Sequence, residues 1–545
     1  MTNFIFFLIF ITTVVVLSKI YSVIKKYFTI KKLRDKWGKL PETQTDLETA
    51  KLLFKLKNRE ESDKHYVLDN ETWNDLNMDD FYHLANRTIT PIGAQCLYEI
   101  LRKPLLSDEE LEKREDIIKT FAGNTGLREK IQVAFLPLSR YNVKFLVYSI
   151  WTQLPAKPKY TFIFYWLTAA AFWVLFLGLG GFIHPGFIFL MFVINSLIVF
   201  AHWNRFKQFL ATFQYLAVLI NTSGKIKSVI NEEFPFISSQ FDKDLKNTRS
   251  IAQNIFSLQF GDDNSIAPYF NAYFLLQLTG FYSALDKIKS NINELRSLFD
   301  IVGYLDALIS IASYREQFPF FVNPTFVKDQ DNFIVKEIYH PLLVSPVAND
   351  FIFESKNILI TGSNMAGKST FLKTIGINAV LAQTVNLCTA KKYEAPFIKV
   401  ITSIERSDDL ISGKSYYLAE VESILKVITA SQNHGIHLFI IDEIFRGTNS
   451  VERTAASIEV LKYLVNKKDY IILATHDLQL TETSEIDYRN YHFREEITDA
   501  GLHFDYKLHS GVSKSKNAIA LLGFVGYPDT IVEGAKNLIK NNSRK

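Results

Sequence analysis

Residues 358–370 read ILITGSNMAGKST, a short apolar run followed by a loop bounded by glycines. The loop fits the pattern G-x-x-x-x-G-K-[ST], with Gly362, Gly367, Lys368 and Ser369 at the defining positions. Glycines let the backbone N–H groups of such a loop converge on phosphate oxygens, and the positive end of the following helix adds to the attraction. The segment therefore predicts a strand, a phosphate-binding loop and a helix in an α/β nucleotide-binding domain.

The side chains of this loop predict ATP and Mg²⁺ as cofactors. Lys368 is expected to reach the β- and γ-phosphates, and the Ser369 hydroxyl to be a magnesium ligand. The complete set of expected phosphate-binding residues is Gly362, Asn364, Gly367, Lys368, Ser369 and Thr370.

Two further apolar runs downstream end in polar residues. The first, 438–443, reads LFIIDE, and its Asp442 is expected to hold Mg²⁺ because a hard cation prefers oxygen ligands. Glu443 is the candidate general base for the attacking water, which would make the chain an ATPase. The second run, 471–474, delivers His476 just after its carboxyl end, where ligands of open α/β sheets bind. His476 is therefore the second catalytic candidate, although alone it would be an ordinary loop residue.

The chain before this region has a helical pattern. Apolar residues recur at helical spacing in 66–150 and 205–316, and the alternation of short apolar runs with helices begins near residue 332. The predicted fold is an α/β P-loop ATPase domain of the ABC type that follows an all-α domain, with three transmembrane helices.

Two regions predict those transmembrane helices. Residues 1–24 begin with an uncharged run, and basic residues follow it, which favours an uncleaved anchor over a cleaved or disordered leader. Residues 160–204 contain no Asp, Glu, Lys or Arg, and turn formers between Gly178 and Gly186 divide them into two spans. A buried core hairpin is the alternative. Basic flanks predict insertion into the inner (cytoplasmic) membrane of a bacterium, with the ATPase domain in the cytoplasm.

Composition excludes several classes of protein. Hydrophobic residues make up 48% of the 545 residues, so the chain is not an intrinsically disordered one. The formal net charge of +4 is too small to indicate nucleic-acid binding by itself. Cys96 and Cys388 fit neither a disulfide framework nor a metal motif, and both are expected to be buried.

With these residues identified, the chain resembles the MutS family of DNA mismatch-repair ATPases. The motifs on which this resemblance rests are TGSNMAGKST at 361–370, SDDLISGKS at 407–415, DEIFRGT at 442–448, ATH at 474–476 and YHPLL at 339–343. Weaker matches are VLD at 67–69 with Thr72, and RTITPIG at 87–93. The resemblance covers roughly 66–150 and 205–540.

The resemblance implies a homodimer with two composite ATP sites. Each site would take its loop from one chain and an in-trans segment, with Ser412, Gly413 and Ser415, from the other. It also implies a DNA clamp or switch with a role related to mismatch repair, and Tyr506 falls where the family places a ring against adenine.

The sequence also departs from the family. Only about forty residues separate the first anchor from the lever-like region, too few for mismatch-reading and connector domains. The hairpin occupies the place of a DNA clamp. DNA binding is thus possible but weakly supported by residues, and mismatch specificity is doubtful. One alternative is a membrane switch or scaffold ATPase that acts on a protein partner without DNA. A less favoured alternative is a transporter ATPase subunit, because no LSGGQ motif lies between the phosphate-binding loop and Asp442.

The expected domain order follows from these assignments. It is a transmembrane anchor at 1–24, a basic cytoplasmic linker at 25–65, a first helical lever/core part at 66–159, the transmembrane hairpin at 160–204, a second helical lever/core part at 205–325, and the ATPase domain with a C-terminal dimerisation tail at 326–545.

Overall fold

The computed structural model divides the chain into two compact units. The first comprises Met1–Lys64, His83–Glu99 and Ile117–Gln317, and the second His65–Tyr82, Ile100–Asp116 and Phe318–Lys545. Two short segments that the sequence places in the first helical part therefore belong to the unit that contains the β-sheets. The described residues are 2–41, 46–58, 66–140, 144–152, 154–256, 267–328, 333–353, 357–362, 366–404, 416–445, 449–465, 467–477, 479–482, 487–498, 501–512 and 518–542.

The first unit is helical, as the sequence predicts. Its helices are α1 (Thr2–Lys36), α2 (Leu47–Asn58), α7 (Thr125–Phe135), α8 (Lys144–Trp151), α9 (Thr161–Leu179), α10 (Gly186–Ile230), α11 (Pro235–Phe256), α12 (Ala267–Phe274), α13 (Leu276–Ser290) and α14 (Ile292–Arg315), with the 3₁₀ turn η1 (Leu138–Arg140). Helices α4 (Met78–Ala85), α5 (Pro91–Arg102) and α6 (Asp108–Gly123) have residues in both units.

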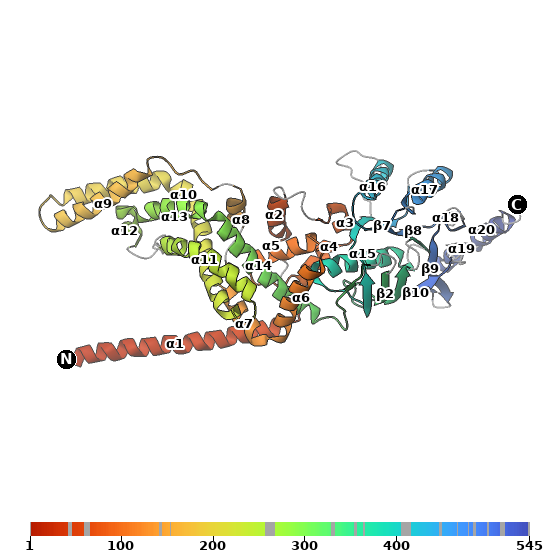
Figure 1. Cartoon of the computed structure of the whole chain (residues 1–545), viewed down its shortest axis with the longest axis horizontal. Helices are drawn as coiled ribbons and strands as arrows, with labels where there is room; N and C mark the ends of the chain where they lie inside the picture. The colour runs from red at the N-terminus through yellow and green to blue at the C-terminus, as the bar shows by residue number, and fades with distance from the viewer. Residues whose placement is uncertain are drawn as a thin grey trace. The chain divides into compact units, whose positions relative to one another are not determined.

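Helices α9 and α10 form the predicted hairpin, with the break between Leu179 and Gly186 (Figure 1). Among the described residues, two helical segments are long and apolar enough to cross a membrane, Thr161–Leu179 and Gly186–Trp203, and only 11% and 6% of them is buried. Trp166 and Phe200 are 73% and 80% exposed. The buried core hairpin is thus disfavoured. Helix α1 covers the predicted anchor but is not one of the two, and the side chains of 1–11 lie outside the described residues.

Helix α10 continues without interruption from the hairpin into the helical unit. It runs for 45 residues, which at about 1.5 Å per residue is roughly 67 Å. Its second half packs into the first unit, with Phe213 stacked on Phe281 of α13 at a ring-centroid distance of 4.9 Å. One helix thus connects an exposed apolar surface with the core of the first unit.

Helices α5 and α14 approach each other closely through small residues. A Cβ added to Gly303 would lie 2.4 Å from the Cys96 sulfur and 3.0 Å from the Ile92 carbonyl oxygen. One turn further along α14, the buried Asp306 carboxylate accepts the backbone N–H of Thr90 at 2.7 Å, just before α5 begins. Burial raises the pKa of Asp306 to about 6, against hydrogen bonds from Thr90 and Ile89 that lower it. The RTITPIG motif is thus a helix-packing motif in this unit.

The second unit contains two β-sheets. A six-stranded sheet has the order β10-β9-β4-β8-β7-β6, parallel throughout except for β10, which pairs antiparallel with β9. A four-stranded sheet has the order β1-β5-β2-β3. The strands are β1 (Thr325–Phe326), β2 (Phe333–Ile338), β3 (Asn349–Phe353), β4 (Asn357–Thr361), β5 (Lys392–Ala395), β6 (Lys399–Ser403), β7 (His437–Asp442), β8 (Tyr470–Ala474), β9 (Arg489–Thr498) and β10 (Gly501–Ser510).

Helices cover both faces of the six-stranded sheet. Helix α15 (Lys368–Val385) lies on one face, and α16 (Tyr416–Ala430) and α17 (Ser450–Val465) lie on the other. The other helices of the second unit, besides the parts of α4 to α6 that belong to it, are α3 (Asn70–Asp75), α18 (Gln479–Glu482), α19 (Ala518–Val525) and α20 (Asp529–Asn542). Alternate side chains of a strand point to opposite faces, so Phe439 packs with residues of α16 and α17 while Ile440 lies against Gly376 of α15. The predicted strands β4, β7 and β8 are confirmed, and each is buried along its whole length. The four-stranded sheet was not predicted.

We predict that Gly303→Ala destabilises the first unit by about 1–3 kcal/mol, because the added methyl group overpacks the contact between α5 and α14. The measurement is the thermal unfolding midpoint of the detergent-solubilised protein. The matched control is Gly224→Ala in α10, where an added Cβ has no neighbour within 4 Å. Its midpoint should stay or rise, since alanine favours a helix by about 1 kcal/mol over glycine. Equal midpoints for both variants would contradict the packing argument.

Candidate functional site

The two glycines that bound the loop between β4 and α15 have the backbone conformation that the sequence predicts. Gly362 and Gly367 both have a positive φ, 137° and 104°, which other residues rarely adopt. A Cβ on Gly362 would also lie 3.0 Å from the Phe493 carbonyl oxygen. Lys368 and Ser369 occupy the first turn of α15, where free backbone N–H groups attract anions. Asn364 lies outside the described residues.

Asp442 is brought to the start of α15, as the sequence predicts. The Ser369 hydroxyl donates to the Asp442 carboxylate at 2.5 Å. A hydroxyl and a carboxylate are oxygen ligands of the kind that Mg²⁺ uses together with substrate phosphates and water. The described residues contain no cluster of three or more His, Cys, Asp or Glu that could hold a metal ion without such help. The two side chains therefore fit a magnesium ion that is bound jointly with a nucleotide.

Three further predicted residues form a continuous polar chain. The Lys368 ammonium donates to the Gly362 carbonyl at 2.5 Å and lies 3.0 Å from Nε2 of His476. The same His476 nitrogen lies 3.2 Å from the Glu443 carboxylate. Nε2 can accept from the ammonium or, when protonated, donate to the carboxylate, but it cannot do both at once. The imidazole therefore lies within hydrogen-bond reach of both the Lys368 ammonium and the Glu443 carboxylate.

The backbone after β7 is strained at this point. Glu443 and Phe445 have φ angles of 65° and 59°, in the left-handed region that costs a non-glycine residue about 1 kcal/mol or more. The Glu443 N–H nevertheless donates to the Ala474 carbonyl of β8 at 2.9 Å. The sheet thus holds Glu443 in an unfavourable conformation, which is typical of functional sites.

A cavity of about 260 Å³ adjoins the start of α15. Its walls include His340, Thr370, Phe371 and Tyr506, and a Cβ on Gly367 would come within 3.2 Å of the Tyr506 ring. Burial, followed by the charge of Lys373, lowers the pKa of His340 to about 4, so its ring is neutral near pH 7. Flat apolar rings beside a phosphate-binding loop fit the base or sugar of a nucleotide.

The residues that line this cavity include one that the sequence did not assign to the site. Tyr506 lines this cavity beside Gly367, and its expected place against adenine stays a prediction. His340 was recognised only as part of the YHPLL motif, and no local pattern gave it a place in the site. Its position depends on the pairing of β2 and β3, which no short motif encodes.

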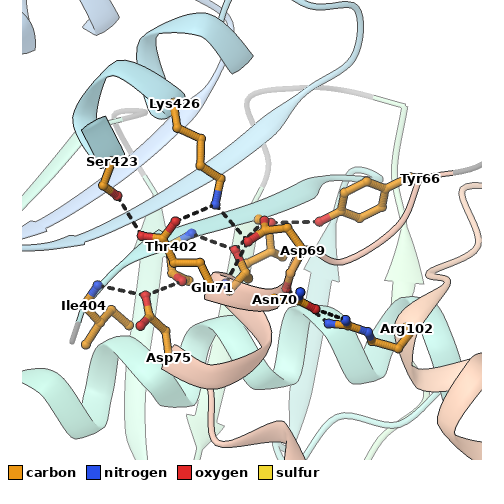
Figure 2. Close-up of polar contacts among 12 residues, drawn as sticks. Tyr66, Asp69, Asn70, Glu71, Asp75, Arg102, Thr402, Ile404, Ser423 and Lys426 are labelled. Atoms are coloured by element: carbon orange, nitrogen blue, oxygen red, sulfur yellow. Dashed lines mark hydrogen bonds and ion pairs between the residues drawn. The ribbon is translucent and has the colours of Figure 1, made fainter. Parts of the chain in front are cut away.

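A second polar cluster joins α3 to the sheet (Figure 2). The buried Asp75 carboxylate accepts from the Thr402 hydroxyl at 2.6 Å and from the Ile404 N–H at 2.9 Å, at the end of β6. On the α16 side, Lys426 donates to Asp69 at 2.8 Å and to Glu71 at 3.1 Å. The short helix therefore contacts both β6 and α16.

Asp69 is the residue on which this cluster centres. Its carboxylate caps α3 by accepting the Thr72 N–H at 3.0 Å. Burial opposes ionisation, but the Lys426 ammonium and the Thr72 hydrogen bonds outweigh it and lower the pKa of Asp69. From the sequence, Asp69 and Thr72 were singled out only as a weak match to the MutS family. Asp is a preferred N-cap residue, and Asp69 followed by the acidic Glu71 could have located the start of the helix.

Strand β6 and helix α16 flank residues 405–415 in the sequence. The predicted in-trans residues Ser412, Gly413 and Ser415 belong to that segment and lie outside the described residues. Their role in a second chain's site stays a prediction. Of the predicted site residues, the structure brings together Lys368, Ser369, Asp442, Glu443 and His476.

Comparison with known proteins covers the segment that contains this site. Residues 358–542 match the protein-family model described as MutS domain V. The chain is 28% identical over 264 residues to the DNA mismatch repair protein MutS of Thermus aquaticus, which is 48% of this chain and 32% of that protein. The corresponding protein of Aquifex pyrophilus is 30% identical over 266 residues, 47% of this chain and 30% of that protein. The chain thus spans about a third of the length of the curated relatives it matches, and its residues 358–542 are similar to domain V of MutS proteins.

Proposed function

We propose that the chain is a MutS-like ATPase that binds ATP with Mg²⁺ and hydrolyses it. The observation that carries the proposal is the meeting of Lys368, Ser369, Asp442, Glu443 and His476 at one end of the parallel sheet, within the segment similar to MutS domain V. Each of these residue types has a role in phosphate chemistry, and their distances let them act on one phosphate group.

The roles follow from the geometry. Lys368 and the first N–H groups of α15 would bind the β- and γ-phosphates. Ser369 and Asp442 would hold Mg²⁺, which neutralises phosphate charge when it is bound. Glu443 would orient a water and accept its proton, and His476 would take up or return that proton across the 3.2 Å contact. The cavity beside Tyr506 would receive the nucleoside.

We predict that Glu443→Gln lowers kcat for ATP hydrolysis by about 100-fold or more, because a general base contributes that much, while the Kd for ATP stays within about threefold. The measurements are steady-state hydrolysis and equilibrium binding of ATP. Glu459→Gln is the matched control, since Glu459 is an exposed partner of Lys462 on α17. Near-normal turnover of Glu443→Gln would remove Glu443 from the role of base.

Further parts of the proposal rest on the resemblance to the MutS family. The protein would act as a homodimer in which Ser412, Gly413 and Ser415 of one chain complete the ATP site of the other. ATP binding would then bring the two sites together, so that the dimer works as a clamp or switch.

The proposal includes integral membrane insertion through the hairpin of α9 and α10. Its support is the apolar surface of Thr161–Leu179 and Gly186–Trp203, of which only 11% and 6% is buried. The basic flanks favour a cytoplasmic ATPase domain in a bacterial inner membrane, with α1 as a third span.

We predict that the protein stays in the membrane pellet after alkaline carbonate washing, because inserted apolar helices do not dissociate from lipid when pH rises. Orientation can be measured with a membrane-impermeant maleimide, since both native cysteines are buried. Ile183→Cys should be labelled in intact cells whose outer membrane has been permeabilised, and Lys536→Cys only after lysis. Release by carbonate would contradict insertion, and labelling of Lys536→Cys in intact cells would contradict the orientation.

The relatives are named as DNA mismatch repair proteins, so DNA is a candidate ligand of this chain. The low net charge of the chain argues against strong DNA binding. Affinity for duplex DNA comes mainly from lysines and arginines that neutralise phosphates. The net charge here is only +4, and many basic residues flank the apolar segments. This charge balance favours the second candidate function, a membrane switch that acts on a protein partner.

We predict that any binding to duplex DNA is weak at physiological salt and prefers a G·T mismatch over matched DNA by less than about tenfold, or roughly 1.4 kcal/mol. The measurement is a competition titration of the solubilised protein with both duplexes, with and without ATP, over a salt series. A larger preference would show that the chain contains a mismatch-reading element and would exclude the second candidate.

A further inference from the structure

The first unit contains a large cavity that the ATPase proposal does not use. Its volume is about 680 Å³, within the range of about 300–1,000 Å³ that is usual for small-molecule sites. One wall is the end of α1 and the turn after it, residues 29–41, and another is residues 86–89. Gln132, Leu136 and Ser139 of the α7–η1 region and Ile309 and Ser313 of α14 complete the lining.

The α1 wall is held by several contacts within the same unit. Arg34 forms a two-point ion pair with Glu129 of α7. The Arg128 guanidinium lies 3.6 Å from the ring centroid of Trp37, and the Gly38 N–H donates to the Ser313 hydroxyl at 3.0 Å. The cavity is therefore built by tertiary contacts, and it does not depend on the chance position of a chain terminus.

The charged lining is mostly positive. Lys32, Lys36, Lys39 and Arg87 line the cavity, against one carboxylate, Asp35. The nearby Glu129 is already paired with Arg34. An anion entering this space would meet an excess of positive charge.

Arg87 is the most informative residue of the set. It is half-buried and donates to two uncharged acceptors, the Lys39 carbonyl and the Gln317 amide oxygen, both at 2.7 Å. Its guanidinium also lies 5.0 Å from the Tyr314 ring centroid. Burial lowers the pKa of Arg87 to about 10, and in the part of the chain that the structure describes no carboxylate pairs with it. A partly desolvated cation without a counter-charge is costly, and a bound anion would supply one.

The chemistry of the lining selects the anion. Arginine and lysine together are the usual ligands of phosphate. The cavity is larger than a phosphate ion needs, and Leu33, Leu40 and Ile89 give it apolar surface for an attached organic group. We propose that this cavity binds a phosphate ester, either the headgroup of an anionic phospholipid or a soluble phosphate ester.

The test is equilibrium dialysis of the full chain, in phosphatidylcholine nanodiscs, with radiolabelled glycerol 3-phosphate. Every protein in the test, including the parent chain, carries Lys368→Ala, so that the ATP site contributes no binding. Reversing two exposed lining charges, in Lys32→Glu with Lys39→Glu, should weaken binding by about tenfold or more. Lys25→Glu with Lys26→Glu is the matched control: it makes the same charge change on α1 outside the cavity and should change the affinity by less than about threefold.

Equal weakening in both pairs of variants, or no saturable binding by the parent chain, would overturn the proposal. Nanodiscs that also contain phosphatidylglycerol distinguish the two sources. A lipid headgroup in the cavity would compete with glycerol 3-phosphate and lower its apparent affinity in the parent chain but not in Lys32→Glu with Lys39→Glu. An unchanged affinity would assign the site to a soluble phosphate ester. Failure of the ATPase proposal would leave these outcomes unaffected.

Discussion

The pairing of β8 with β4 on one side and β7 on the other is the constraint on which the candidate site depends. The hydrogen-bond ladder continues past the strand ends, where the Thr475 N–H donates to the Ile360 carbonyl at 2.9 Å. Glu443 is held in the same way by Ala474. The distances among Glu443, His476 and Lys368 are therefore set by the sheet, in which β4, β7 and β8 are buried along their whole length.

A second constraint comes from a short segment that precedes the hairpin in the sequence. Helix α3 has only six residues and would not be stable alone, so its cap at Asp69 and its contacts with β6 and α16 must stabilise it. Conversely, Asp75 satisfies the Ile404 N–H at the point where β6 ends. Removing a buried carboxylate would leave such donors unsatisfied, which costs about 1–3 kcal/mol for each group. The segment is thus an integral part of the second unit.

Sequence reasoning succeeded where the chemistry is local. The loop at Gly362–Lys368, the buried strand before Asp442 and the break of the hairpin at Gly186 are each encoded by neighbouring residues, and each is found where it was predicted. It failed where distant segments combine. The membership of α3 in the second unit, the place of His340 in a cavity and the assembly of residues 29–41 with Arg87 all depend on tertiary contacts that leave no periodic signal.

The first unit is built from segments on both sides of the hairpin, and this has a consequence for its biosynthesis. Phe121 packs against Phe234 at a ring distance of 5.6 Å, and Trp151 of α8 packs against Phe299 of α14 at 5.0 Å. The ribosome delivers the earlier partner of each pair first, and the hairpin must emerge before the later partner exists. The nascent chain therefore carries apolar faces on α6 and α8 without their final partners until the segment from Phe234 to α14 has been translated. During that interval these faces depend on chaperones or on transient collapse for protection from aggregation.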